Sequence, residues 1–332
     1  PEGEYLLGIN PDGSVDCDSV VAYLGIKLFT IVDEPSAGDV GQWPRIAIGT
    51  DGRPVISYLD DAASDLKVAK CANAMCTGES TLTTVDAAAS AGGSTGTSIA
   101  VAADGLPVIS YTAALNLRVA KCANPACTGS ATITTVDPAN VVGQYSSIGI
   151  GTDGRPVISY WDAGAGALKV AKCANAACTG AATITAVDEP ANSVGEFTSL
   201  AIGADGFPVI SYRDATAGAL KVAKCANAAC TGAATITTVD DPANNVGEYT
   251  SIAIGADGRP VISYFDRTAS ALKVAKCANA ACSGMATITT VEDYPAVPPI
   301  IVGTYTSIAI SADGLPIIAY SHGGLEPVTT HG

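Results

Sequence analysis

A motif of about 50 residues recurs six times along this chain of 332 residues, and this repeat limits the possible folds. The fifth copy begins with SIAIGADGRPVISYFD at residue 251. An aliphatic residue marks the same point of each copy: Ile46, Ile99, Ile148, Leu200, Ile252 and Ile308. Repeats of this length are typical of propellers and solenoids, in which each unit buries its apolar face against its neighbours.

Four short segments with strand character form each unit. In the fifth copy they span residues 250–255, 260–265, 271–277 and 286–291, and they are rich in Ile, Val, Thr and Tyr. No unit has the three- and four-residue apolar spacing of a helix, which excludes helical repeats. Because four strands make one blade, we predict an all-β fold, a six-bladed β-propeller with four strands per blade. A β-solenoid is the alternative, but it would need capping repeats, which the sequence does not offer.

The two ends of the chain predict how the ring closes. The sixth unit has a first strand at 306–311, a second at 315–320 and a weak third at 325–330, but no fourth. Residues 27–33 read KLFTIVD and align with ATITTVD, the fourth strand of another unit at 234–240. We therefore expect this N-terminal strand to complete the last blade and close the ring. The predicted domains are a cysteine-containing leader or stalk junction at residues 1–26 and the propeller at residues 27–332.

Two resemblances accompany this pattern. The order G-x-x-x-I-A-I-x-x-D-G-x-P-x-I-S-Y-x-D, followed by L-K-V, resembles the NHL and YWTD families of six-bladed propellers. It implies their strand order, with the innermost strand before the Asp-Gly turn. The Cys-x4-Cys hairpin of each blade departs from the NHL pattern, so the resemblance carries over the fold and not the function. The leader string EYLLGINPDGSVDCD is similar to short elements between the stalks and heads of bacterial surface proteins and tail fibres.

Ten of the 11 cysteines form five pairs with one spacing, which predicts disulfides and an oxidising, extracellular compartment. The pairs are Cys71–Cys76, Cys122–Cys127, Cys173–Cys178, Cys225–Cys230 and Cys277–Cys282. We expect no metal, because each pair offers two sulfurs where zinc needs four ligands and the only histidines are His322 and His331. Cys17 is predicted to be unpaired in this chain, with a partner upstream or in another chain, or to be a free thiol.

Charge and hydropathy exclude two classes of partner. The net charge of −15 repels nucleic acids and anionic lipids. The longest apolar stretches fall far short of the roughly 20 residues that span a bilayer. We expect no nucleic-acid binding and no membrane insertion.

Two repeated polar features are predicted to be structural. Asp-Gly occurs in all six units, at Asp51, Asp104, Asp153, Asp205, Asp257 and Asp313. We interpret it as a tight turn rather than a calcium site, because calcium needs six to eight converging oxygens. A basic pair on each third strand, such as Lys67 and Lys70, is expected to lay its stems over neighbouring blades and its ammonium groups in water.

The copies differ from one another mainly on the face formed by the loops after the second and fourth strands. We predict a ligand-binding surface there, built from aromatic rings, an arginine and carboxylates. Its candidate residues are Trp43, Tyr145, Trp161, Phe197, Arg213, Tyr249, Phe265, Tyr305, Asp162, Asp214 and Asp266. Acidic residues such as Glu196 and Glu248 lie in the same loops. There are two alternatives. The aromatic residues before the first strand of each unit could wedge between blades, and the positions after the tyrosine of the second strand could vary neutrally.

These features predict an extracellular ligand-recognition or adhesion module, without cofactor or enzymatic activity, that binds a glycan, a peptide or a surface polymer. The alternative is a structural subunit of a surface layer, filament or appendage, with self-association or attachment to an upstream stalk. A glycoside-active enzyme is a third possibility. We expect it less, because six-fold repetition gives no carboxylate pair the distinct surroundings that acid–base catalysis needs.

Overall fold

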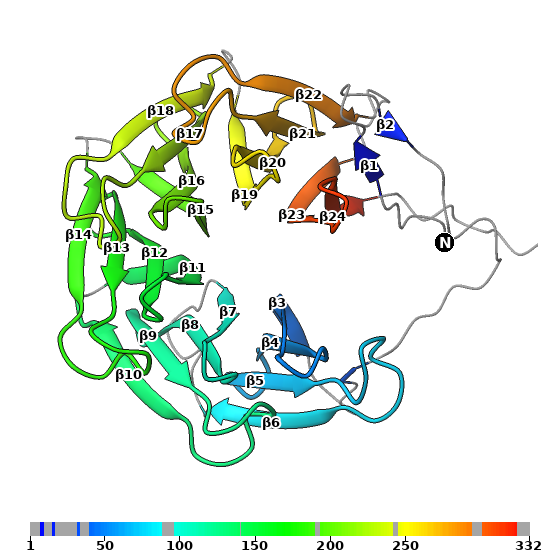
Figure 1. Cartoon of the computed structure of the whole chain (residues 1–332), viewed down its shortest axis with the longest axis vertical. Helices are drawn as coiled ribbons and strands as arrows, with labels where there is room; N and C mark the ends of the chain where they lie inside the picture. The colour runs from blue at the N-terminus through cyan, green and yellow to red at the C-terminus, as the bar shows by residue number, and fades with distance from the viewer. Residues whose placement is uncertain are drawn as a thin grey trace, which may run out of the picture.

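The computed structural model describes residues 7–9, 15–16, 32–33, 40–87, 96–139, 141–189, 193–241, 245–293 and 301–323. These residues form six antiparallel sheets of four strands, which stand around a central axis as in a β-propeller (Figure 1). The predicted all-β fold with four-stranded repeats is therefore confirmed. Within the described residues, no helix is long and apolar enough to span a membrane.

Each sheet runs from an inner strand at the axis to an outer strand at the rim (Figure 1). The first sheet holds β3 (Val40–Ile48), β4 (Pro54–Asp60), β5 (Asp65–Lys70) and β6 (Thr81–Asp86). The second holds β7 (Thr97–Val101), β8 (Pro107–Ala113), β9 (Asn116–Lys121) and β10 (Thr132–Asp137). The third holds β11 (Val142–Ile150), β12 (Pro156–Asp162), β13 (Ala167–Lys172) and β14 (Thr183–Asp188).

The remaining sheets follow the same plan. The fourth holds β15 (Val194–Ile202), β16 (Pro208–Asp214), β17 (Ala219–Lys224) and β18 (Thr235–Asp240). The fifth holds β19 (Val246–Ile254), β20 (Pro260–Asp266), β21 (Ala271–Lys276) and β22 (Thr287–Glu292). The sixth joins β23 (Ile301–Ile310) and β24 (Pro316–Gly323) to two N-terminal strands, β1 (Leu7–Ile9) and β2 (Val15–Asp16).

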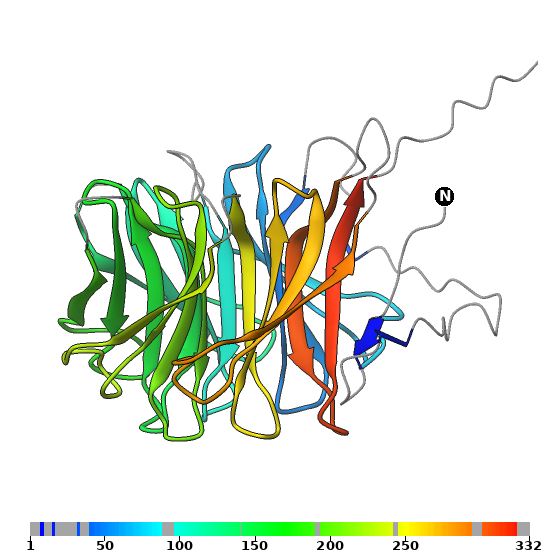
Figure 2. The same ribbon diagram turned by 90° about the horizontal axis from the view of Figure 1, so that it is seen from above.

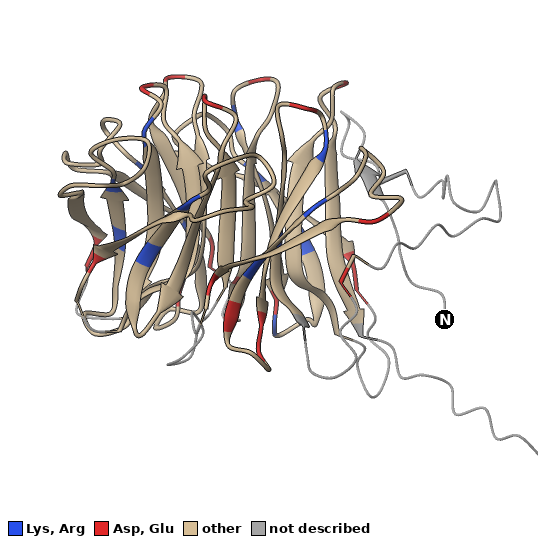
Figure 3. Cartoon of the chain, turned by 90° about the horizontal axis from the view of Figure 1, so that it is seen from below, with Lys and Arg blue, Asp and Glu red and all other residues tan. Residues whose placement is uncertain are grey.

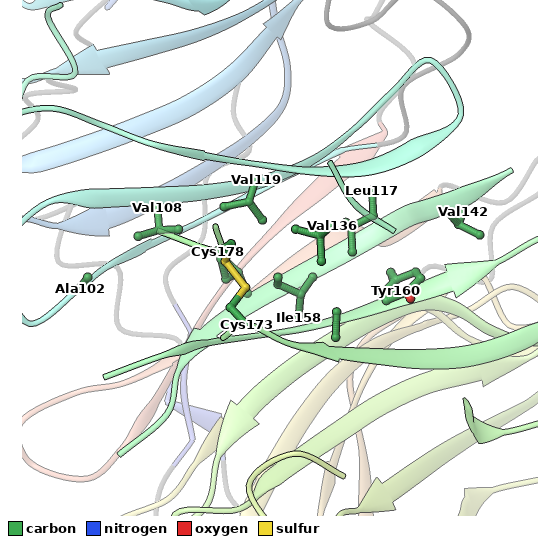
Figure 4. Packing of buried hydrophobic residues seen from close by; sticks show 12 residues of the cluster. Ala102, Val108, Leu117, Val119, Val136, Val142, Ile158, Tyr160, Cys173 and Cys178 are labelled. Atoms are coloured by element: carbon green, nitrogen blue, oxygen red, sulfur yellow. A yellow bond between two sulfur atoms is a disulfide. The ribbon is translucent and has the colours of Figure 1, made fainter. Parts of the chain in front are cut away.

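Hydrophobic cores lie between consecutive sheets. Between the second and third sheets, Val119 and Leu117 pack with Ile158, Tyr160 and the neighbouring side chains (Figure 4). The alternating pattern of each strand explains this arrangement, because successive side chains point to opposite faces and so serve two interfaces. Clusters of this kind join all five consecutive pairs from the first sheet to the sixth. Among the described residues, no such cluster joins the sixth sheet to the first.

Two buried hydrogen bonds recur between neighbouring sheets. In the second to sixth sheets, a tyrosine hydroxyl of the second strand donates to the acid that ends the outer strand of the preceding sheet, as Tyr160 does to Asp137 at 2.7 Å. A serine hydroxyl of the second strand meets a hydroxyl of the next inner strand, as Ser211 meets Thr250 at 2.7 Å. Burial raises the pKa of Tyr160, and the bond to the Asp137 carboxylate raises it further. Paired polar groups of this kind fix the angle between sheets.

The five predicted disulfides are present. Four of them also belong to the cores between sheets, as Cys173–Cys178 does in Figure 4. An asparagine inside each loop, such as Asn175, accepts from the backbone N–H groups of Ala177 and Thr179 at 3.0 and 3.1 Å. The bridges therefore contribute apolar packing as well as closing hairpins. They indicate an oxidising environment.

The Asp-Gly turns lie along one edge of the disc, for example between β19 and β20 and between β23 and β24 (Figure 2). The Asp153 carboxylate accepts from the Arg155 N–H at 3.1 Å and from the Lys172 ammonium at 2.7 Å. Acidic turns with basic residues beneath them are visible along the upper edge in Figure 3. The prediction that the lysine ammonium groups reach water was therefore wrong for Lys172, whose side chain is only 8% exposed. Lys70, Lys121 and Lys224 are buried against carboxylates of their own sheets in the same way, whereas Lys276 is 52% exposed.

The predicted closure by residues 27–33 is not confirmed. In the structure β1 pairs with β24, with Leu7 opposite Ile318, and β2 forms the outer edge of the sixth sheet. Two strands of the segment assigned to a separate leader thus join the last sheet. Residues 27–31, the weak strand at 325–330 and Cys17 lie outside the described residues. The Asp33 carboxylate is described, and it accepts from the Tyr58 hydroxyl at 2.6 Å.

Candidate active site at the axial mouth

Five aromatic side chains surround the axis where the inner strands begin. Ring centroids lie 4.5 Å apart for Tyr145 and Phe197, 4.7 Å for Phe197 and Tyr249, 4.5 Å for Tyr249 and Tyr305, and 5.6 Å for Tyr305 and Trp43. We call these five residues the aromatic ring. The sixth place, just before β7, belongs to Gly96, so the ring has a gap.

A β-bulge places each of these side chains at the axis. In β11, Gln144 pairs with Trp161 and Ser147 pairs with Ser159, so Tyr145 and Ser146 lie opposite the single residue Tyr160. Tyr145, inside the bulge, adopts a φ of 54°, and the other four aromatic residues have φ between 51° and 54°. A bulge redirects a side chain, and a left-handed backbone at a non-glycine residue is strained. The next sheet supports it, since Thr250 donates to the Phe197 carbonyl at 2.9 Å.

One arginine joins two carboxylates beside this ring. The Arg213 guanidinium lies 2.6 Å from Glu196 and 3.7 Å from Glu248. Arg267 lies 3.1 Å from Glu248 on its other side. The Glu248 side chain is only 6% exposed and that of Glu196 17%. We call Glu196, Glu248, Arg213 and Arg267 the carboxylate cluster.

The aromatic ring and the carboxylate cluster share one electrostatic environment. Glu196 and Glu248 directly precede Phe197 and Tyr249 in the chain. Burial raises the pKa of the Tyr145 phenol, and the charge of Glu196 raises it further against the opposing effect of Arg213. The Nε atom of Arg213 is buried without a hydrogen-bond partner among the described residues.

The predicted site residues fall into three groups. The aromatic ring contains Trp43, Tyr145, Phe197, Tyr249 and Tyr305, and its outer contacts are Trp161, 6.0 Å from Tyr145, and Phe265, 6.4 Å from Tyr249. Arg213 belongs to the carboxylate cluster.

The third group comprises Asp162, Asp214 and Asp266, which hold loops and lysines. Asp214 accepts from the Ala217 N–H at 2.9 Å and pairs with Lys221 at 2.8 Å. Asp162 and Asp266 pair in the same way with Lys169 and Lys273.

Sequence reasoning placed Glu196 and Glu248 in the loops of the predicted surface but did not select them as site residues, and it did not consider Arg267. The signal was present, because glutamate stands only in the fourth and fifth units, where the first and third have Gln42 and Gln144. Within the described residues, no group of three His, Cys, Asp or Glu side chains could hold a metal ion.

A scan of protein-family models finds no match for this sequence, and a search of curated proteins finds none either. Solved structures share the fold at low identity. A point mutant of the NanB sialidase from Streptococcus pneumoniae has a TM-score of 0.59 and 8% identity over 91% of this chain and 69% of that chain. A Hadza microbial sialidase has a TM-score of 0.54 and 11% identity over 86% and 65%. A protein of unknown function from Dyadobacter fermentans has a TM-score of 0.55 and 13% identity over 85% and 94%.

These comparisons correct three predictions. The solved structures named here do not support the NHL or YWTD type, so the shared feature is the propeller fold alone. The predicted recognition or adhesion module, its structural-subunit alternative and the absence of enzymatic activity are contradicted by the similarity to sialidases, which are glycan-cleaving enzymes. Six-fold repetition does not make all carboxylates equivalent, because within the described residues Arg213 pairs with Glu196 and Glu248 only in the fourth and fifth sheets.

Proposed function

We propose that this protein hydrolyses glycosidic bonds at the axial mouth of the propeller. The observation that carries the proposal is the Arg213 guanidinium between Glu196 and Glu248, next to five aromatic rings. Glycoside hydrolysis uses two carboxyl groups on either side of the scissile bond. Aromatic faces offer apolar platforms for sugar rings, and the carboxylates and Arg213 offer hydrogen bonds to hydroxyl groups.

The two acids differ in their surroundings, which suits them to different roles. Glu248 faces two guanidinium groups and is the more buried, so we assign it to activate water or attack the sugar as a carboxylate. Glu196 faces Arg213 alone and is assigned to protonate the leaving oxygen. The bond between the anomeric carbon and that oxygen breaks, the proton passes from Glu196 to the leaving group, and water supplies the hydroxyl of the released sugar.

The test is turnover of a panel of aryl glycosides and polysaccharides by the purified protein. Glu248→Gln and Glu196→Gln should each lower kcat by about 10²- to 10⁴-fold, because each removes one proton-transfer group. Glu79→Gln is the matched control, since Glu79 is an exposed residue outside the site. A wild-type protein that turns over none of the panel, or glutamine variants that keep full activity, would contradict the proposal.

Secretion into an oxidising compartment and a glycan ligand form part of the same proposal. Five disulfides support the first and the aromatic ring supports the second. Attachment to an upstream stalk stays a prediction, as does the division at residue 26.

We also infer that the first and last sheets close on one another, because an axial site needs a complete rim. Asp33 supports this inference. It bonds Tyr58 and lies 3.1 Å from Lys67, as Asp240 bonds Tyr264 and lies 3.8 Å from Lys273. Asp240 ends β18, the outer strand of the fourth sheet, and Tyr264 belongs to the fifth sheet.

A paired substitution supports closure independently. At five interfaces a serine of the second strand bonds a hydroxyl of the next inner strand. At the seam both positions change together, to Ala319 on β24 and Pro44 on β3. An alanine and a proline suit an apolar contact, and neither leaves a hydroxyl unpaired. Both residues line a cavity of about 690 Å³ between these sheets in the structure.

A further inference from the structure

Asn245, directly before β19, departs from the repeat and contacts the carboxylate cluster. The equivalent residues are Val141 before β11 and Ser193 before β15. The side-chain oxygen of Asn245 accepts a hydrogen bond from Nη2 of Arg213 at 2.8 Å. Arg213 lies on β16 of the fourth sheet, whereas Asn245 leads into the fifth sheet. This hydrogen bond therefore joins the two sheets that carry the proposed site.

The turn between β20 and β21 fixes the backbone of Asn245. The Asn245 carbonyl accepts from the Arg267 N–H at 2.9 Å, and the Asn245 N–H donates to the Thr268 hydroxyl at 2.9 Å. The Asp266 carboxylate holds the same turn by accepting from the Thr268 N–H at 3.0 Å. Because its main chain is bound on both sides, Asn245 can hold its amide in one direction at little entropic cost.

The fourth sheet has the same backbone arrangement with different side chains. The Ser193 carbonyl accepts from the Ala215 N–H at 2.9 Å, and the Ser193 N–H donates to the Thr216 hydroxyl at 3.1 Å. The fifth unit has Asn245 where the fourth has Ser193. It also has Arg267 where the fourth has Ala215. Both differences add a polar contact to the carboxylate cluster on a backbone that the repeat already provides.

These contacts give each glutamate its own hydrogen-bonded arginine. Arg213 donates from Nη1 to Glu196 at 2.6 Å and from Nη2 to Asn245. The nearest Glu248 oxygen lies 3.7 Å from Nη2, beyond hydrogen-bond distance, and it accepts from Arg267 at 3.1 Å instead. Without the Asn245 amide oxygen, Nη2 would be free to turn to Glu248, and one guanidinium would bond both acids. Asn245 therefore keeps the two ion pairs separate.

We propose that Asn245 is a positioning residue, which assigns Arg213 to Glu196 and leaves Glu248 to Arg267. This inference rests on the proposed function, in which the two acids have different roles. A carboxylic acid that donates a proton and a carboxylate that activates water need different, fixed surroundings. Asn245 acts through Arg213 rather than on the reacting atoms.

Arginine labelling by phenylglyoxal, read by peptide mass spectrometry, tests the positioning without a substrate. In the wild-type protein Arg213 should react more slowly than the exposed Arg53, because hydrogen bonds occupy its guanidinium. Asn245→Ser introduces the residue of the fourth unit, and Asn245→Leu removes the acceptor at similar volume. Each should speed the labelling of Arg213 by about tenfold. Asn245→Asp keeps an acceptor and should keep Arg213 protected.

Ser193→Ala is the matched control, because it changes the equivalent side chain of the fourth sheet and keeps the backbone bonds. It should leave the labelling of Arg213 unchanged. Asn245→Ser should fold, since Ser193 occupies the same backbone arrangement. Equal labelling of Arg213 in the wild-type protein and in both acceptor-free variants would overturn the proposal. Faster labelling in Asn245→Ser but not in Asn245→Leu would also overturn it, because it would reflect only the smaller side chain.

Turnover tests the consequence for the reaction. On any aryl glycoside that the wild-type protein cleaves, Asn245→Ser and Asn245→Leu should lower kcat by about 10- to 100-fold, because the acids lose their alignment. KM should stay within about twofold, since the aromatic ring is unchanged. Faster labelling of Arg213 with an unchanged kcat would overturn the positioning role. A wild-type protein without turnover would refute hydrolysis, and the labelling comparison would still decide whether Asn245 fixes Arg213.

Discussion

At the scale of single residues, buried acids with cationic and N–H partners link stability to pH. The N–H of Ala63 and the Lys67 ammonium lower the pKa of Asp60 against the effect of burial. Hydrogen bonds from lysines also lower the pKa of Asp51 and Asp257, although these two side chains are exposed. A lowered folded-state pKa contributes stability that is present above the unfolded pKa, about 3.9, and is lost as pH falls through the folded value.

We therefore expect the free energy of unfolding to fall as pH is lowered from 5 to below about 4. Asp60→Asn keeps an acceptor for the Ala63 N–H but removes the charge, so its stability should depend less steeply on pH over this range. Urea titrations at several pH values would measure both slopes. Asp61→Asn, at the exposed neighbouring residue, should keep the wild-type slope. Parallel slopes for Asp60→Asn and wild type would refute the assignment.

Residue types predicted part of the site and could not predict its geometry. The residues of the aromatic ring were selected because an aromatic side chain occurs at this place in five of the six units, and the structure brings them together. The pairing of Arg213 with both Glu196 and Glu248 depends on the bulge of β15 and on the angle between two sheets. Neither quantity is contained in the spacing of residues along the chain. The glutamates at 196 and 248 were visible as departures from the other units, but only their ion pairs with Arg213 give them meaning.

At the scale of elements, the glycine before each bulge lets one inner strand approach the third strand of the preceding sheet. A Cβ on Gly195 would lie 2.8 Å from the Leu168 Cα, and φ at Gly195 is 103°. Backbone cannot yield as a flexible side chain can, so Gly195→Ala should destabilise the protein by about 2–4 kcal/mol. Chemical denaturation would measure this. A loss below about 0.5 kcal/mol would mean that the sheets separate there at little cost.

The elements themselves were largely predictable. Strand order, Asp-Gly turns and disulfide pairs follow from local chemistry that the chain repeats, and repetition makes each signal visible several times. The lysines were misjudged because their partners, such as Asp153 for Lys172, lie 19 residues away in sequence. Strand register decides that contact. The two N-terminal strands were missed because they match no repeat.

At the scale of the whole molecule, closure of the ring can be tested at Gly41. This glycine occupies the place of Gly195 in the first sheet, and in the open seam its added Cβ meets nothing within 4 Å. If the first and last sheets close as the other pairs do, Gly41→Ala should cost about as much as Gly195→Ala. If Gly41→Ala lowers the free energy of unfolding by only about 1 kcal/mol, the positive φ alone explains the loss, and closure is contradicted. The comparison needs only two variants and one denaturation assay.

The repeated hydrogen bonds at the interfaces between sheets also affect how such a chain can change in evolution. The same serine, tyrosine and acid recur at successive interfaces, so the two faces of a middle blade fit any other middle blade. Unequal crossing-over within the gene would insert or delete a unit whose contacts are already complementary. The seam, where Pro44 and Ala319 replace the hydroxyl pair, is the exception. The number of sheets is therefore free to vary by duplication in the interior of the chain, while in a ring closed as proposed the first and last sheets must change together.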